Sequence, residues 1–409
     1  MAIDFKGPLS GIKIIDITEV VMGPSATQMM ADLGADVIKI EPPGGDILRK
    51  TGIGGANDAG ALFLNLNRNK RSLVLDLKTP QGLKAVLKLA QTADALVYNV
   101  RPQAMKRLGL GYEALRDVNP RIVYLGAFGF SQRGQYASAR AFDDLIQAAV
   151  AIPDASMRAG SDVPRYAPLN LADRATGIYA FGVLCAALLS RDRTGVGQAV
   201  DVPMFETMAQ VVLGDHLYGH TFVPPRGDFG YPRLLNAERK PYKTQDGYAC
   251  CLVYTEDQWR AFIQASGESS LLQSDPRLKD GESRTRHIQE LYQILATKLA
   301  EKTTQQWKDI LEPLGIPVFA VHTFDSLLED PHLEDIGFFK EMQHPTEGTL
   351  RTMAVPSEWS GSELGEFRSP PLLGEHSREI LLELGLSTEE VQEMVDRGIT
   401  QVAPLPVQS

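Results

Sequence analysis

The stretch that decides the fold is Ile12-Lys13-Ile14-Ile15-Asp16-Ile17, together with Asp36-Val37-Ile38-Lys39-Ile40-Glu41 downstream. Both runs are short, apolar and rich in β-branched residues, and Pro42-Pro43-Gly44-Gly45 ends the second, so they predict two strands. Between them, Gly23-Pro24-Ser25 predicts a turn with Ser25 as the N-cap of a helix, and Gly34 predicts where that helix stops. The chain therefore opens as strand, helix, strand.

A second unit of the same kind follows. Strands are predicted at Ser72–Leu77, Ala95–Tyr98 and Arg121–Leu125, with a helix from Thr79-Pro80 through Ala90. Strands that alternate with helices at this spacing predict an α/β fold with a mostly parallel, Rossmann-like sheet and right-handed crossovers. The first turn is Val21-Met22-Gly23-Pro24 rather than Gly-x-Gly-x-x-Gly, so dinucleotide binding is not predicted.

The pattern of predicted helices and strands changes after residue 200. Strands are predicted at 248–254 and 317–321 and helices near 256–266, 284–300 and 304–312, so residues 225–325 are interpreted as a smaller α+β domain. Near the end, Ser387-Thr388-Glu389-Glu390 has the spacing of a capping box and predicts a C-terminal helix.

Composition limits the classes of function. The 409 residues carry 41 Lys and Arg against 51 Asp and Glu, a formal net charge of -10, which argues against a general nucleic-acid binder. The first residues lack a signal-peptide core, and the longest uncharged apolar run is shorter than the roughly 20 residues of a membrane span. The three cysteines have neither disulfide nor zinc spacing. We therefore expect a cytoplasmic protein without a metal site or a membrane contact.

An acidic residue, Asp173, comes just before the uncharged apolar stretch Ile178–Leu189, which predicts a helix buried on most sides. Two interpretations of Asp173 fit the local sequence. It is a helix cap, because Asp is among the best N-cap residues. Alternatively it is a nucleophile whose pKa is lowered by the helix dipole and by free backbone amides.

Basic and polar residues follow two of the predicted strands. Asn67-Arg68-Asn69-Lys70-Arg71 and Lys78 surround the third strand, and Asn99, Arg101 and Arg107 follow the fourth. Ligands bind at the carboxyl ends of parallel strands, and Arg suits phosphate contacts, so this set predicts a phosphate-bearing ligand. The neighbours Asp143 and Asp144 lie on different faces of any helix or strand, which makes a paired acid/base role weak.

These motifs, in this order, resemble the family III CoA-transferases, which include formyl-CoA, carnitine-type and bile-acid CoA-transferases. The resemblance covers nearly the whole chain and is carried by 9–16, 33–41, 69–73, 99–102, 107–109, 173–177, 194–198 and 373–376. It implies a large Rossmann-like domain built from both termini, 1–224 with 326–409, a smaller domain at 225–325, and two interlocked subunits.

The resemblance also implies the chemistry. Asp173 would attack an acyl-CoA thioester to give a mixed anhydride; CoA thiolate would then form an aspartyl-CoA thioester, and a carboxylic acid acceptor would take over the CoA. No cofactor beyond CoA itself is implied. By the same matching, the CoA-binding set comprises Val21, Met22, Leu75, Lys78, Asn99, Val100, Arg101, Arg107 and Arg140, with Val21 and Met22 near the thioester.

The chain departs from the family pattern in three places. Val21 stands where members with a well-described site carry Gln, and Pro42 stands where they carry a nucleotide-contacting Arg, for which Arg49 is the candidate substitute. The run of glycines that formyl-CoA transferases carry in the smaller domain is absent between 225 and 250. Formyl/oxalate exchange is therefore not expected, and the acceptor acid stays open.

Two rival functions are weighed against a transferase. An α-methylacyl-CoA racemase needs a second acid/base group, supplied in that branch by a His about thirty residues before the Asp. Phe142 occupies that position here, and no His precedes His216. A non-catalytic CoA-binding protein is the other rival; for a pure binder, Asp173→Ala would leave affinity unchanged.

Overall fold

The computed structural model describes residues 6–54 and 59–403, which form two compact units. Unit 1 comprises Met1–Val150, Ala167–Val211 and Asp335–Ser409, and unit 2 comprises Ala151–Tyr166 and Val212–Glu334. The division differs in detail from the predicted one. The long segment of unit 2 begins near 212 and ends near 334, whereas 225 and 325 were predicted. A short segment before Asp173 belongs to unit 2 as well.

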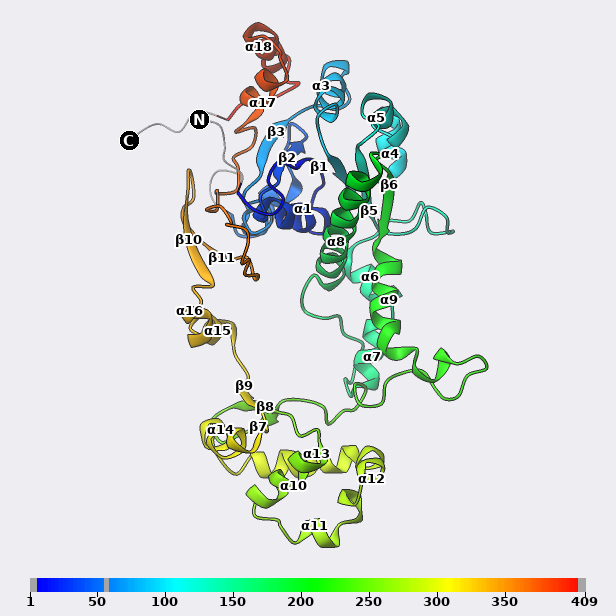
Figure 1. Cartoon of the computed structure of the whole chain (residues 1–409), viewed down its shortest axis with the longest axis vertical. Helices are drawn as coiled ribbons and strands as arrows, with labels where there is room; N and C mark the ends of the chain where they lie inside the picture. The colour runs from blue at the N-terminus through cyan, green and yellow to red at the C-terminus, as the bar shows by residue number, and fades with distance from the viewer. Residues whose placement is uncertain (1–5, 55–58, 404–409) are drawn as a thin grey trace. The chain divides into compact units, whose positions relative to one another are not determined.

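Unit 1 is built on a six-stranded parallel sheet in the order β3-β2-β1-β4-β5-β6, which is the doubly wound Rossmann order (Figure 1). The predicted α/β class with a parallel sheet is confirmed. Its strands are β1 Lys13–Ile17, β2 Asp36–Glu41, β3 Arg71–Val74, β4 Ala95–Tyr98, β5 Val123–Phe128 and β6 Ala199–Pro203.

Helices cover both faces of this sheet. On one face, Ile15, Ile17, Ile38 and Ile40 pack into a single apolar core, because alternate residues of a strand point the same way. The helices of that core are α3 Pro80–Ala90, α4 Pro102–Arg107, α5 Tyr112–Val118, α17 Ser377–Glu383 and α18 Thr388–Asp396. The other face carries α1 Met22–Asp32 and α8 Leu171–Thr194, which lie side by side (Figure 1).

The first helix begins earlier than predicted. Its N-cap is Val21, whose side chain caps nothing, and Ser25 lies inside the helix with its hydroxyl donating to the Met22 carbonyl at 2.9 Å. Pro24 is tolerated there because the first backbone amides of a helix have no intrahelical acceptor. Gly34 does end the helix as predicted, with φ +97°. The predicted Asp36–Glu41 and Ala95–Tyr98 strands are confirmed, whereas β3 and β5 are shifted by a few residues.

The prediction that the α8 helix is buried on most sides is wrong. One face is buried through Thr176, Ala180 and Leu184, but Ile178 is 61% and Leu189 52% exposed. Among residues 6–54 and 59–403, α8 is the one helix long and apolar enough to cross a membrane by length and composition. A core helix passes the same test, and α8 packs against α1, β5 and β6.

Buried ion pairs lie within and beside the sheet. Lys70 donates to Asp16 at 3.0 Å with both side chains fully buried, and Arg68 pairs with Asp32 and Arg71 with Asp36 at 2.7 Å each. The prediction that Arg68, Lys70 and Arg71 bind a phosphate-bearing ligand is therefore wrong. They balance acids of β1, α1 and β2, because a buried charge is costly unless it is paired.

The C-terminal part of the chain returns to this same edge of the sheet. Arg68 also donates to the Thr352 hydroxyl and the Met353 carbonyl, and Arg71 donates to Glu383 at 2.9 Å. The segment contains the hairpin β10 Phe339–His344 and β11 Gly348–Met353 before α17 and α18. Ser387 begins α18 with the predicted capping box. Both ends of the described chain thus complete unit 1.

Unit 2 has its own apolar core, which includes Trp259, Phe262 and Trp307. A three-stranded antiparallel sheet, β7 Tyr242–Lys243, β8 Tyr248–Cys251 and β9 Val318–Ala320, packs with helices into the predicted α+β arrangement. Its longer helices are α10 Glu256–Ala265, α13 Ile288–Leu299 and α14 Thr304–Leu311.

Short elements complete both units. In chain order they are η1 Ile47–Lys50, α2 Ala61–Leu64, α6 Asp143–Ala149, α7 Ile152–Arg158, α9 Met204–His216, η2 Tyr218–Thr221, α11 Leu271–Ser274, η3 Pro276–Leu278, α12 Gly281–Arg286, η4 Glu312–Leu314, α15 Phe324–Leu328 and α16 Pro331–Asp335.

Candidate functional site

Asp173 lies in the first turn of α8, two residues after the start of the helix, and its side chain is half-buried. The N-cap is Asn170, and it makes no side-chain cap hydrogen bond. Among the described residues, no group donates a hydrogen bond to the Asp173 carboxylate, whose own backbone N–H is already taken. The cap interpretation of Asp173 is therefore wrong, and its carboxylate oxygens are available for chemistry.

The cap of this helix comes instead from Asp143, a residue that the sequence argument set aside. Asp143 begins α6 and is 8% exposed, and its Oδ1 accepts the backbone N–H of Asp173 at 2.9 Å. Its Oδ2 accepts from Gln147 Nε2 at 2.6 Å, and Gln147 Oε1 accepts the backbone N–H of Ala167 at 2.9 Å. Asp143 and Gln147 thus fix the chain that leads into Asp173.

The pKa of Asp173 is raised to about 6, chiefly by burial and secondly by the negative charge of Asp143, while Arg174 lowers it. The sequence predicted the opposite direction. That prediction assumed that free backbone amides would bond the carboxylate, but the Asp173 amide itself is bonded to Asp143. A carboxylate with a pKa of about 6 is still mostly ionised at neutral pH, and it is more basic than an ordinary Asp.

A glycine contact brings the start of α8 against the start of α1. A Cβ at Gly177, one turn after Asp173, would lie 2.1 Å from Ser25 Oγ and 2.8 Å from the Met22 carbonyl oxygen. Only glycine permits this approach between the two helices. Asp173 is therefore held one helical turn from the Val21-Met22 segment that the sequence placed near the thioester.

The turn between β1 and α1 is held by Asn99 at the end of β4. Asn99 Nδ2 donates to the Glu19 carbonyl at 2.7 Å, and Asn99 Oδ1 accepts the Glu19 backbone N–H at 3.0 Å. The next residue, Val20, has φ +68°, which costs energy for a β-branched side chain and marks a strained turn. Val21 follows and is buried among Leu48, Phe63 and Leu66.

The predicted CoA-binding residues separate into two groups by exposure. The side chains of Lys78, Arg101, Arg107 and Arg140 are exposed. Those of Val21, Met22 and Leu75 are buried, and Val100 is half-buried against the apolar core. The segments after β1, β3, β4 and β5 all leave the carboxyl edge of the parallel sheet, and Lys78 and Arg101 follow the ends of β3 and β4 within four residues.

Arg49, the candidate substitute for the Arg that Pro42 replaces, is not available to a ligand. It is 3% exposed, donates to both oxygens of Glu41 at 2.7 and 2.8 Å, and donates to the Pro371 carbonyl at 3.1 Å. Its guanidinium also stacks on the Phe63 ring at 3.8 Å. The expectation for Arg49 is wrong, because its donors already bind an acid of β2 and the C-terminal segment.

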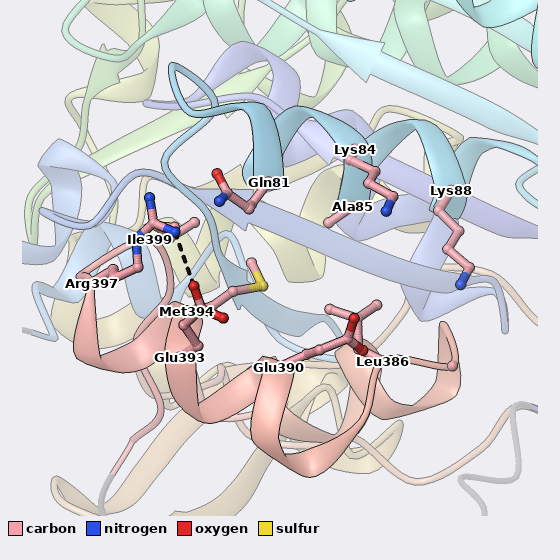
Figure 2. Close-up of a pocket in the computed structure, with 11 residues that line it drawn as sticks. Gln81, Lys84, Ala85, Lys88, Leu386, Glu390, Glu393, Met394, Arg397 and Ile399 are labelled. Carbon is pink, nitrogen blue, oxygen red and sulfur yellow. Dashed lines mark hydrogen bonds and ion pairs between the residues drawn. The ribbon is translucent and has the colours of Figure 1, made fainter.

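A pocket between α3 and α18 lies elsewhere in unit 1 (Figure 2). In Figure 2, Lys84 and Lys88 of α3 face Glu390 and Leu386, and the nearby Arg397 donates to Glu393 at 3.1 Å. The pocket mixes both signs of charge and contains none of the predicted site residues. It therefore does not compete with the Asp173 region as the candidate site. Within the described ranges, we find no group of three His, Cys, Asp or Glu side chains arranged to hold a metal ion.

Comparison with known proteins places this geometry in a family. The family described as CoA-transferase family III matches residues 9–377. The succinyl-CoA:glutarate CoA-transferase of Mus musculus is 31% identical over 93% of this chain and 87% of its own length. The formyl-CoA:oxalate CoA-transferase of Streptomyces avermitilis is 34% identical over 96% of this chain and 99% of its own.

A solved structure agrees with these relatives. The crystal structure of a CAIB/BAIF family protein from Brucella suis superimposes with a TM-score of 0.79 at 27% identity, covering 93% of this chain and 100% of that one. The match therefore includes the sheet, the helices around it and unit 2. The chain belongs to CoA-transferase family III and is a CoA-transferase.

Proposed function

We propose that Asp173 is the nucleophile of a covalent CoA transfer. Its carboxylate attacks the acyl-CoA carbonyl, and the C–S bond breaks. CoA departs as the thiolate, and a mixed anhydride of Asp173 and the donor acid remains. The thiolate then attacks the Asp173 carbonyl carbon of the anhydride, which releases the donor acid and forms an aspartyl-CoA thioester. The acceptor carboxylate attacks that thioester to give a second anhydride, and the thiolate attacks its acyl carbonyl. The second acyl-CoA leaves, and the Asp173 carboxylate is regenerated.

The observation that carries this proposal is the state of the Asp173 carboxylate. It is half-buried and receives no hydrogen bond from the described residues, although its backbone is fixed by Asp143. A carboxylate bonded to several amides would be a poor nucleophile, because those bonds stabilise its charge. Burial instead raises the pKa of Asp173 to about 6, and a more basic carboxylate attacks a carbonyl more readily.

The acyl-CoA is bound by the carboxyl edge of the sheet. Lys78, Arg101, Arg107 and Arg140 supply exposed cations for its phosphates, and Arg can bond two phosphate oxygens at once. Asn99 contributes by fixing the β1–α1 turn, and the buried Val21, Met22, Leu75 and Val100 shape the edge through their backbone and packing. The thioester end then lies toward Met22 and toward Asp173, which precedes by one helical turn the Gly177 that contacts Met22.

A racemase gains no support. Phe142, at the position where an acid/base His would be needed, is 65% exposed and cannot carry a proton. Asp143 is close to Asp173, but both of its oxygens accept hydrogen bonds, so it is a positioning residue. A racemase needs a second acid/base group, and the described residues around Asp173 do not supply one from Phe142 or Asp143.

The working enzyme is a homodimer in this proposal. The outward face of α8 leaves Ile178, Tyr179 and Leu189 about half exposed or more. An apolar face of this kind on a long helix indicates an interface, since monomers seldom leave such patches in water. A second copy of the chain is the occupant that the interlocked family architecture implies.

The acceptor is a carboxylic acid, and no cofactor beyond CoA takes part. Relatives are named for succinyl-CoA with glutarate and for formyl-CoA with oxalate. The segment 225–250 lacks a run of glycines, so formyl/oxalate exchange is the less suitable of the two. Activity is expected to survive dialysis against EDTA, and the protein is expected in the cytoplasm.

The test is mass spectrometry of the full chain incubated with a panel of short acyl-CoA and diacid-CoA thioesters, then trapped with hydroxylamine or borohydride. A CoA adduct or a hydroxamate on Asp173 is the expected result and names the donor. Asp173→Ala is the control and should give no adduct. Absence of any adduct in the wild type, together with α-proton exchange in deuterated water, would overturn the covalent mechanism in favour of an isomerase.

A further inference from the structure

We propose that a basic pocket inside unit 2 binds the carboxylate of a small organic acid. The pocket measures about 310 Å³ and is lined by Arg233, Arg239, Lys240, Tyr242, Leu252 and Tyr292, among others. All of these residues belong to unit 2.

Three cations line this pocket against one nearby acid. Lys240 pairs with Glu238 at 3.1 Å, and Arg239 makes no ion pair with any described residue. Arg233 is half-buried, and its Nε is buried without a hydrogen-bond partner in the described ranges. A buried donor without a partner costs free energy, so an acceptor from a ligand would stabilise it. The excess of positive charge in the pocket therefore favours the binding of an anion.

The position of Arg233 is fixed by aromatic rings. Its guanidinium carbon lies 5.5 Å from the centroid of the Tyr254 ring. Burial lowers the pKa of Arg233, but its interactions with Tyr292 and Tyr231 outweigh that effect and raise the pKa above its ordinary value. A planar guanidinium held in this way presents a pair of parallel N–H groups, which match the two oxygens of a carboxylate. The site is thus partly ordered before a ligand arrives.

The remaining walls of the pocket are largely apolar. Tyr242, Cys251 and Tyr292 are each about 5% exposed and belong to the apolar core of unit 2, so they form a rigid side of the pocket. Leu252 adds another apolar surface. A volume of about 310 Å³ lies at the small end of ligand pockets. The class of ligand is therefore a carboxylate carried on a compact apolar body.

Calorimetric titration of the full chain with hexanoate tests the pocket, with acetate and inorganic phosphate as comparison anions. Arg233→Met and the double variant R239M/K240M should each weaken hexanoate binding by about tenfold or more, since a charged hydrogen bond is lost. Arg233→Lys should fall between, because lysine keeps the charge but not the fork. The control is Arg286→Met, an exposed cation of unit 2 outside the pocket.

The Asp173 adduct should form at the wild-type rate in these variants, because no pocket residue belongs to the Asp173 region. If Arg233→Met does not fold, the exposed R239M/K240M pair decides. Unchanged hexanoate binding in the variants, or phosphate binding as tightly as hexanoate, would overturn the pocket. If no wild-type adduct forms at Asp173, the covalent mechanism fails, and the calorimetry still decides the pocket.

Discussion

The Asp143 carboxylate accepts the backbone N–H of Asp173 at 2.9 Å, so one acid anchors the helical turn from which the other projects. This contact has two effects on Asp173. The hydrogen bond fixes the backbone, but the negative charge of Asp143 raises the pKa of Asp173 on top of the effect of burial. Asp143 therefore both fixes the backbone of Asp173 and adds to the rise in its pKa that burial mainly causes, although it lies thirty residues earlier in the sequence.

Asp143→Asn separates these effects. The asparagine Oδ1 can still accept the Asp173 amide, although its Nδ2 cannot accept from Gln147 as Asp143 Oδ2 does. Because the negative charge is gone, the pKa of Asp173 should fall below about 6. In the wild type, the rate of adduct formation should rise with pH through about 6 as Asp173 ionises. In the variant, this midpoint should move to lower pH in single-turnover experiments from pH 4.5 to 8.

The matched control is Asp144→Asn, because Asp144 is exposed beside Asp143. Its profile should superimpose on that of the wild type. An equal shift in both variants would show that the effect arises from net charge and would contradict the specific pairing.

Asp173→Asn should make the protein more stable near neutral pH. The folded pKa of about 6 lies above the ordinary value of 3.8, so the folded state binds the proton more tightly than the unfolded state. Stability due to this group therefore falls as pH rises from about 4 to 6 and stays lower above that. Thermal unfolding should show a higher Tm for the variant at pH 7.5 and nearly equal Tm values at pH 4.

Gly177→Ala should reduce both stability and adduct formation. The new methyl would meet the Met22 carbonyl oxygen and Ser25, and the resulting overpacking should cost about 1–3 kcal/mol. Gly214→Ala in α9 is the control, since its methyl meets nothing within 4 Å and alanine favours a helix by about 0.5–1 kcal/mol. Chemical unfolding measures the stability of both variants. Equal stability of the two variants would contradict the close α1–α8 approach.

Arg101→Ala should affect ligand binding, whereas Arg68→Ala should affect stability. Arg101 is exposed, so its loss should raise KM for acyl-CoA by about tenfold with little change in Tm. Arg68 is buried and pairs with Asp32 at 2.7 Å, so its loss leaves an unpaired buried acid and should cost about 3–5 kcal/mol. Steady-state kinetics and urea unfolding, measured on both variants, distinguish a ligand-binding arginine from a structural one.

Light scattering should give about 90 kDa for the homodimer, which is twice 44.8 kDa. Ile178→Asp places a charge on the outward face of α8 and should lower the measured mass toward that of the monomer. Ile53→Asp introduces the same charge at a residue that is 89% exposed on a loop, and it should leave the mass unchanged. A wild-type mass near 45 kDa would contradict the dimer.

The sequence predicted the sheet well, because β2 and β4 are short apolar runs and Gly34 takes the positive φ of a helix stop. It failed where partners are distant along the chain. Arg68 and Lys70 resemble ligand-binding cations until Asp32 and Asp16 are seen beside them. Asp143 was passed over because adjacency to Asp144 says nothing about an amide thirty residues away. The start of α1 was missed because its N-cap, Val21, carries no capping side chain.

The bonds that Arg68 and Arg71 make with Thr352 and Glu383 also have a consequence for synthesis on the ribosome. These residues lie 284 and 312 positions apart, so the first strands emerge long before their last partners do. During that interval, Arg68 and Arg71 have Asp32 and Asp36 as partners but lack their acceptors in the C-terminal segment. We therefore expect translation intermediates that stop before residue 352 to depend on chaperones and to remain sensitive to proteases.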